Sequence, residues 1–210
     1  MPTFPNKSTW IFDFDGTLVD SMRQLTELAA TILTRYYGTP DEEAREQYRQ
    51  TSGLPFVQQV ARLHPDRPEN EAAVTEFERT KAERYLDRPL YPEVPSALCT
   101  LRSRGGWIAV SSSNGQSLVE TYCARHNLPI DCICGWRPAF TKGAVHFGHI
   151  LRQSSQPREA ALFVGDSLRD AREATDHGID FVARAGTFAA EEFHAVRADI
   201  PVIHSLTELL

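Results

Sequence analysis

Several features are missing from this 210-residue sequence, and each absence excludes a class of protein. No apolar run approaches the roughly 20 residues that a membrane-spanning helix needs, so we expect no membrane partner. The first residues do not carry a basic segment followed by an apolar one, so we predict no secretory signal and expect a cytoplasmic protein. The formal net charge of -6 argues against a broad surface for nucleic acid.

Cysteine is scarce, and its spacing does not match the CxxC pairs of common zinc or redox motifs. The four cysteines are Cys99, Cys123, Cys132 and Cys134. Cys132 and Cys134 alternate along a predicted strand, so we expect buried free thiols.

His146 and His149 fall on one side of a predicted helix, but the sequence offers no evident third ligand, and a metal site needs more than two. We therefore predict ordinary packing or solvent contact for both histidines.

Residues 9–20 carry the most informative pattern in the sequence. The apolar residues 10–12 predict a buried strand that ends in two carboxylates, Asp13 and Asp15. Side chains alternate along a strand, so both carboxylates should point the same way. Two like charges this close need a bound cation, or one of them must take a proton. A simple turn at the strand end explains Asp15 with Gly16, but it does not explain a costly charge at Asp13 within an apolar run.

The chain divides into two regions of different character. Residues 21–88 show helical spacing of apolar positions without a convincing strand, which predicts a helical cap domain inserted after the first strand. Residues 1–20 and 89–210 form the other region, in which the predicted strands are 107–111, 131–134, 161–165, 181–183 and 202–204. Strands that alternate with helices indicate a parallel sheet covered on both faces, so we predict an α/β, Rossmann-like three-layer core.

Polar side chains gather at the predicted carboxyl ends of these strands, where such sheets bind ligands. Beside the first two carboxylates, this set comprises Ser111, Ser112, Ser113, Asn114, Lys142, Asp166 and Asp170. Each alone has an ordinary explanation, since serines cap helices and lysines are solvated. Together they suit phosphoryl transfer: carboxylates can hold Mg²⁺, and a lysine with hydroxyls can neutralise phosphoryl charge. One carboxylate can act as nucleophile and a second as general acid and base.

Residues 13–20, with the sequence DFDGTLVD, resemble the first motif of the haloacid dehalogenase-like superfamily. Ser112 fits the second motif, with the register among the three serines left open, Lys142 fits the third, and residues 165–170 fit the fourth. The helical insert resembles the cap of phosphoglycolate-phosphatase-like and phosphomutase-like members. The resemblance therefore extends over nearly the whole chain.

This resemblance implies a role for each matching residue. Asp13 would be the nucleophile and Asp15 the general acid and base. The phosphoryl group would be bound by Ser112, Ser113, Asn114 and Lys142. Mg²⁺ would be held by Asp13, the backbone carbonyl of Asp15 and Asp166, with Asp170 supporting the site. In the insert, Arg49 precedes a polar break that contains Gly53, and both could set substrate specificity; a plain helix–helix turn with a solvated arginine is the alternative.

The leading functional prediction is a Mg²⁺-dependent phosphatase that hydrolyses a small phosphorylated metabolite through an aspartyl-phosphate. A phosphomutase is the first alternative, because it uses the same residues around the phosphoryl group. A dehalogenase proper lacks the second acid of the first motif, so Asp15 speaks against it. A non-catalytic phosphoryl-acceptor module is a further alternative, but it needs neither Asp15 nor a lid. The natural substrate, and the choice between monomer and homodimer, stay open.

Overall fold

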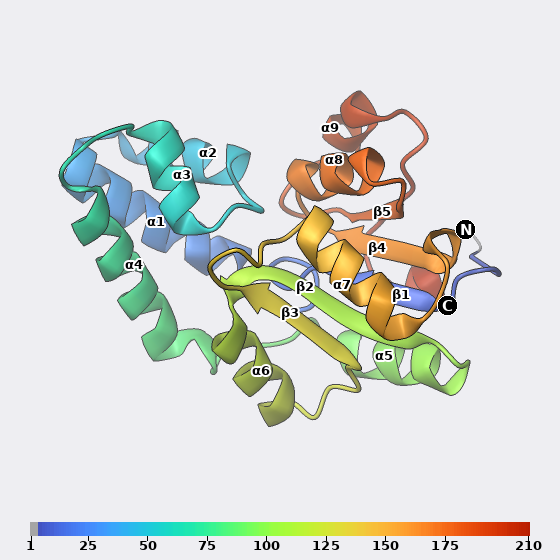
Figure 1. Cartoon of the computed structure of the whole chain (residues 1–210). Coiled ribbons are helices and arrows are strands. Elements are labelled where there is room, and N and C mark those ends of the chain that lie inside the picture. The colour runs from blue at the N-terminus through green and yellow to red at the C-terminus, as the bar shows by residue number, and fades with distance from the viewer. Residues whose placement is uncertain (1–3) are drawn as a thin grey trace. The chain divides into compact units, whose positions relative to one another are not determined.

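The computed structural model describes residues 4–210, which form two compact units. The first unit joins the N-terminal residues up to Asp20 with residues 89–210, and the second consists of residues 21–88. Figure 1 shows the helices and strands of both. Each unit has its own buried apolar core and is described by itself.

The first unit is built on one sheet of parallel strands, in the order β3-β2-β1-β4-β5-β6. The strands are β1 (Thr9–Phe12), β2 (Trp107–Gly115), β3 (Cys132–Trp136), β4 (Ala161–Gly165), β5 (Asp180–Arg184) and β6 (Val202–Ile203). Strand β1 pairs in parallel with β2 on one side and with β4 on the other. The chain moves outward from β1 to β3 and then returns to β4, so the strand order reverses between β1 and β4. Ligands of such sheets bind beyond the carboxyl ends of the strands at this reversal.

Helices cover both faces of this sheet (Figure 1). The helices of this unit are α5 (Val94–Ser103), α6 (Gln116–Arg125), α7 (Ala144–Ser154), α8 (Leu168–Asp176), α9 (Ala190–Val196) and the short η1 (Arg158–Ala160) and η2 (Leu206–Leu209). One core layer packs Phe147 of α7 and Phe193 of α9 with Ile11 and Phe163 of the sheet. On the opposite face, Tyr122 of α6 meets the ring of Phe14 edge-on. The predicted α/β, Rossmann-like three-layer fold with a parallel sheet is thus confirmed.

The second unit consists of helices α1 (Met22–Tyr37), α2 (Asp41–Gln50), α3 (Phe56–Leu63) and α4 (Asn70–Tyr85). Their apolar faces meet in a core that includes Leu25, Leu33 and Val60. The rings of Phe56 and Phe77 stack there with centroids 3.8 Å apart. The apolar residues of this segment recur at helical spacing along the sequence, so each helix buries one apolar stripe against the others. That spacing is the basis of the prediction that the segment is helical.

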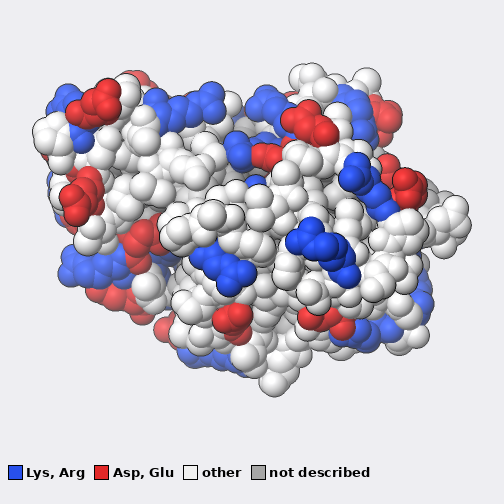
Figure 2. Space-filling model, viewed as in Figure 1, with Lys and Arg blue, Asp and Glu red and all other residues white. Residues whose placement is uncertain are grey.

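No helix within residues 4–210 is long and apolar enough to cross a membrane. On the face drawn in Figure 2, basic side chains are interspersed with acidic ones.

Candidate active site

Asp13 lies at the carboxyl end of β1, beside the point where the strand order reverses. Its backbone N–H donates a hydrogen bond to the carbonyl of Val164 at 2.8 Å, so the pairing with β4 continues one residue past the strand. The Asp13 side chain is buried, and Lys142 Nζ lies 2.6 Å from its Oδ1. The same Nζ lies 2.6 Å from Oδ1 of Asp170. One buried ammonium group therefore bridges two buried carboxylates that lie 157 residues apart in the sequence.

Asp170 is fixed by the first turn of α8. The Ser167 hydroxyl accepts a hydrogen bond from the Asp170 N–H at 3.1 Å, and Asp170 Oδ2 accepts one from the Ser167 N–H at 3.3 Å. This reciprocal capping box satisfies donors that a helix start leaves free. Gly165 makes room for it, because a Cβ at that position would lie 2.7 Å from Asp170 Oδ2. The residues Gly-Asp-Ser at the end of β4 thus hold the Asp170 carboxylate in place through local backbone geometry.

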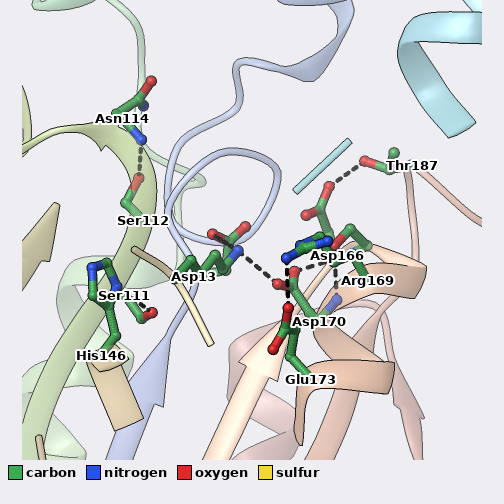
Figure 3. Close-up of polar contacts among 12 residues, drawn as sticks. Asp13, Ser111, Ser112, Asn114, His146, Asp166, Arg169, Asp170, Glu173 and Thr187 are labelled. Carbon is green, nitrogen blue, oxygen red and sulfur yellow. Dashed lines mark hydrogen bonds and ion pairs between the residues drawn. The ribbon is translucent and has the colours of Figure 1, made fainter. Parts of the chain in front are cut away.

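A third carboxylate, that of Asp166, completes a cluster with Asp13 and Asp170. Each of the three offers an oxygen within 4.8 Å of the others, and all three side chains are buried. The hydroxyl of Thr187 donates a hydrogen bond to Asp166 Oδ2. Figure 3 shows Asp13, Asp166 and Asp170 with their polar contacts.

The electrostatics of this cluster follow from burial and from an excess of negative charge. Burial raises the pKa of Asp13 to about 7, although Lys142 acts in the opposite direction. Burial, followed by the charges of Asp13 and Asp170, raises the pKa of Asp166 well above its ordinary value. Burial alone would lower the pKa of Lys142, but the neighbouring charges of Asp13 and Asp170 outweigh it and raise that pKa. The lysine therefore carries its proton, and the cluster still has fewer positive charges than carboxylates.

The donor set of the cluster fits a hard divalent cation. Carboxylate oxygens are the ligands that Mg²⁺ prefers, and the cluster supplies three of them from two adjacent strand ends. Burial and the neighbouring negative charges disfavour the ionised forms of Asp13 and Asp166, and a cation there would favour them. The cluster thus offers the oxygen donors that a hard divalent cation needs.

Asp15 follows the same strand, β1, as Asp13 and lies in the turn after it. Strand β1 ends at Phe12, so Asp13 and Asp15 both come after the strand, and the expectation that their side chains point the same way stays a prediction. Asp15 belongs to a turn in which the Gly16 N–H donates to the Val19 carbonyl at 2.9 Å and Gly16 adopts a positive φ of 75°. The Asp15 side chain accepts a hydrogen bond from Nδ2 of Asn114 at 2.7 Å.

The serine run lies on β2, which extends to Gly115 rather than ending at Ser111 as predicted. Pairing with β3 shifts register between Ser111 and Gly115, and this irregularity accommodates the extra length. Ser111 is fully buried, and its hydroxyl lies 3.0 Å from Nδ1 of His146 in α7. The Ser112 hydroxyl accepts a hydrogen bond from the Asn114 N–H at 3.0 Å (Figure 3). Ser111 therefore contacts α7 through His146. Ser112 is instead hydrogen-bonded to Asn114, which in turn donates to Asp15.

Two predicted residues, Arg49 and Gly53, belong to the second unit. Arg49 forms an ion pair with Glu46 on the same helix at 2.8 Å. Gly53 has a φ of 88°, which suits the turn between α2 and α3. Their expected part in substrate specificity stays a prediction.

Sequence reasoning missed Thr187 and the contact between Ser111 and His146. Thr187 follows β5 and carries no motif around it, and only the sheet order brings it to Asp166. His146 is buried and lies against the ring of Phe140, with centroids 4.6 Å apart, in keeping with the predicted packing role. Burial lowers its pKa to about 4, so the imidazole is neutral at pH 7. No sequence signal distinguishes this histidine from a surface one.

Comparison with known proteins agrees with this geometry. Over 176 residues the chain is 30% identical to a phosphoglycolate phosphatase of Synechococcus elongatus, a match that covers 82% of this chain and 81% of that protein. It is 24% identical to the tyrosine-protein kinase PtkA of Mycobacterium tuberculosis, over 94% of this chain and 68% of that protein. A crystal structure of a haloacid dehalogenase-like hydrolase from Bacteroides fragilis superposes with a TM-score of 0.79 at 24% identity, covering 97% of this chain and 100% of the other.

The family match covers most of the chain. Residues 10–184 match the family described as haloacid dehalogenase-like hydrolase, a span that runs from the second residue of β1 to the end of β5 and contains the whole helical insert. The superfamily predicted from residues 13–20 is therefore confirmed, and so is the prediction of an enzyme. The chain belongs to the haloacid dehalogenase-like hydrolase family.

Proposed function

We propose that this protein is a Mg²⁺-dependent phosphatase that hydrolyses a small phosphorylated metabolite through an aspartyl-phosphate on Asp13. The observation that carries the proposal is the buried arrangement of Asp13, Lys142 and Asp170, with both ion pairs at 2.6 Å, beside Asp166. The name of the relative from Synechococcus elongatus, phosphoglycolate phosphatase, supports the same activity.

The reaction divides into two displacements on phosphorus. In the first, an Asp13 carboxylate oxygen forms a bond to phosphorus while the bond from phosphorus to the substrate oxygen breaks, and Asp15 gives that oxygen a proton. In the second, the Asp15 carboxylate takes a proton from water as the water oxygen attacks the same phosphorus. The bond to Asp13 then breaks and inorganic phosphate leaves. The hydrogen bond from Asn114 to Asp15 orients the carboxylate for both proton transfers.

The cationic and hydroxyl groups around Asp13 would bind the transferring phosphoryl group. Lys142 has the charge for this role, and its salt bridges to Asp13 and Asp170 hold its Nζ at the nucleophile. Ser112, Ser113 and Asn114 lie near the carboxyl end of β2, which pairs with β1, and offer hydroxyl and amide donors. Such preorganised donors stabilise charge that develops in the transition state.

Asp13 and Asp166, with the backbone carbonyl of Asp15, would hold Mg²⁺, and Asp170 would support the site. When bound, the ion supplies positive charge that neutralises phosphoryl oxygens. Asp13 must be ionised to attack phosphorus, and a positive partner favours its charged form. Thr187 keeps Asp166 oriented through its hydrogen bond.

The test is a phosphate-release screen over a panel of phosphorylated metabolites with Mg²⁺, followed by Asp13→Asn on the best substrate. We expect steady release of free phosphate by the wild type and none by the folded variant, because an amide cannot attack phosphorus. Asp176→Asn, which changes an exposed carboxylate at the end of α8, is the matched control. Substantial turnover by folded Asp13→Asn would refute the mechanism.

Hydrolysis must also be separated from transfer to another hydroxyl. A phosphomutase returns the phosphoryl group to a sugar, and one relative bears the name of a tyrosine-protein kinase. Chromatography of the reaction products together with the phosphate assay distinguishes these outcomes. Isomerised substrate without stoichiometric phosphate would favour the mutase over the proposed phosphatase.

A further inference from the structure

A second cluster of metal-ligating side chains lies at the edge of the sheet. Cys132 and Cys134 project from the same side of β3, with their sulfur atoms 3.8 Å apart. His149 of α7 offers a ring nitrogen to the same place, and the three ligand atoms all lie within 4.8 Å of one another. The cluster contains His149 but not His146, and its other two ligands come from β3.

The fold explains why these three residues meet. Residues two apart on a strand share a face, which places both thiols on the side of β3 that α7 covers. Cys134 pairs in register with Ser111 of β2, and Ser111 contacts His146 one helical turn before His149. The ring of Phe140 lies edge-on to that of His149, with centroids 5.4 Å apart, and limits its movement. The imidazole is therefore held near the thiols by packing.

The spacing of the sulfur atoms suits a thiophilic cation. Zinc binds thiolate sulfur at about 2.3 Å in tetrahedral sites, which places two such sulfurs about 3.8 Å apart. The observed separation of 3.8 Å needs no rearrangement of β3. A disulfide would instead require the sulfurs to approach to about 2.05 Å between residues two apart on one strand. All four cysteines are free thiols.

We propose that Cys132, Cys134 and His149 bind a thiophilic d¹⁰ cation, of the class of Zn²⁺ or Cu⁺, at a site separate from the carboxylate cluster. Two sulfurs and one imidazole are the ligands that such ions prefer, whereas the carboxylate oxygens at Asp13 suit Mg²⁺. Three protein ligands leave one tetrahedral position for water or another small ligand. The site joins the edge strand to the helix that begins two residues after Lys142.

The experiment uses the full, reduced, metal-free protein with excess Mg²⁺ present to occupy the carboxylates. Co²⁺ is the spectroscopic probe, because thiolate ligands give a near-ultraviolet charge-transfer band that oxygen ligands do not. Zn²⁺ is then titrated in competition with a chromogenic chelator. We expect one equivalent of Co²⁺ with the thiolate band, displaced by Zn²⁺. We also expect Cys132→Ser and His149→Gln each to weaken binding by roughly 10–100-fold or more.

The controls separate this site from other thiols and from a folding defect. Cys99→Ser removes an exposed thiol on α5 and should leave binding unchanged. Cys132 and His149 are only partly buried, so their variants should fold, which circular dichroism checks; fully buried Cys134 is left intact. Tight Cu⁺ binding without Zn²⁺ binding would support the site with the monovalent ion. Absence of the thiolate band with no binding of either ion, or unchanged affinity in both variants, would overturn the proposal.

Discussion

Replacing Asp13 with asparagine should make the metal-free protein less sensitive to pH. In the folded protein burial raises the pKa of Asp13 from 3.8 to about 7. Between these two values the folded state holds a proton that the unfolded state has released, so stability falls as the pH rises. Asp13 therefore stabilises the folded state at low pH, and this contribution to the free energy of unfolding is lost as the pH rises through about 7. Asparagine keeps the size of the side chain and cannot titrate.

The size of this effect follows from the two pKa values. Between pH 5 and pH 8, a carboxyl group with a pKa of 3.8 when unfolded and about 7 when folded loses about 2–3 kcal/mol of stability. Asp166 also has a raised pKa and acts in the same direction in both proteins. The Asp13 charge is one cause of that raised pKa, so Asp166 loses less stability over this interval in the variant, which enlarges the difference from the wild type in the same direction.

Urea unfolding in EDTA at pH 5 and pH 8 measures the difference. The wild type should lose about 2–3 kcal/mol more than Asp13→Asn over this interval, and Asp176→Asn should behave like the wild type. Excess Mg²⁺ should restore stability to the wild type at pH 8, because a cation favours the ionised carboxylate. Equal pH dependence in wild type and Asp13→Asn would show that Asp13 is not held protonated by burial.

Four other changes test separate parts of the proposed site. Asp15→Asn should slow turnover by about 10²–10⁴-fold, least for substrates with good leaving groups; equal loss for all would contradict its role as acid. EDTA should abolish activity and Mg²⁺ restore it, with Asp166→Ala sharply weakening the response, whereas full activity after exhaustive chelation would rule out the metal. Gly165→Ala should lower the free energy of unfolding by about 1–3 kcal/mol, because its Cβ would crowd a carboxylate oxygen at 2.7 Å, and an unchanged urea midpoint would disprove this close fit. Arg49→Ala and Gly53→Ala should change the ranking of substrates more than hydrolysis of a small generic phosphate ester; a uniform loss would place specificity elsewhere.

Much of the fold was predictable because its signals are local. Strand β4 has the bounds predicted from its apolar run, and α3 begins and ends where its apolar stripe does. The extension of β2 to Gly115 was not predictable, because Ser-Ser-Ser-Asn has weak strand preference and only pairing with β3 stabilises it there. The short helix α9 gave no clear apolar periodicity, and burial of Phe193 in the sheet core fixes it. The secondary structure of such segments is set by tertiary contacts rather than by the local sequence.

The site was predictable where a residue lies in a motif and unpredictable where it depends on sheet order. Asp13 and Asp166 each follow a buried strand, so their meeting at one edge follows from parallel pairing. The turn at Gly16 was predictable from that glycine, which adopts a positive φ, but the end of β1 at Phe12 could not be located from alternation alone. Thr187 contacts Asp166 only because β5 lies next to β4. Residues that are far apart in the sequence cannot be paired until the order of the strands is known.

Helix α7 carries one ligand of the proposed thiol site and begins two residues after Lys142, which contacts the carboxylate cluster. Lys142 precedes this helix and bridges Asp13 and Asp170, while His149 within it faces the two thiols. Between them, His146 contacts Ser111 on β2, next to Ser112. A cation on the thiols would tie α7 to β3 and so reduce the freedom of the helix that follows Lys142. Because one site offers oxygen and the other sulfur, the two select ions of different hardness and need not compete.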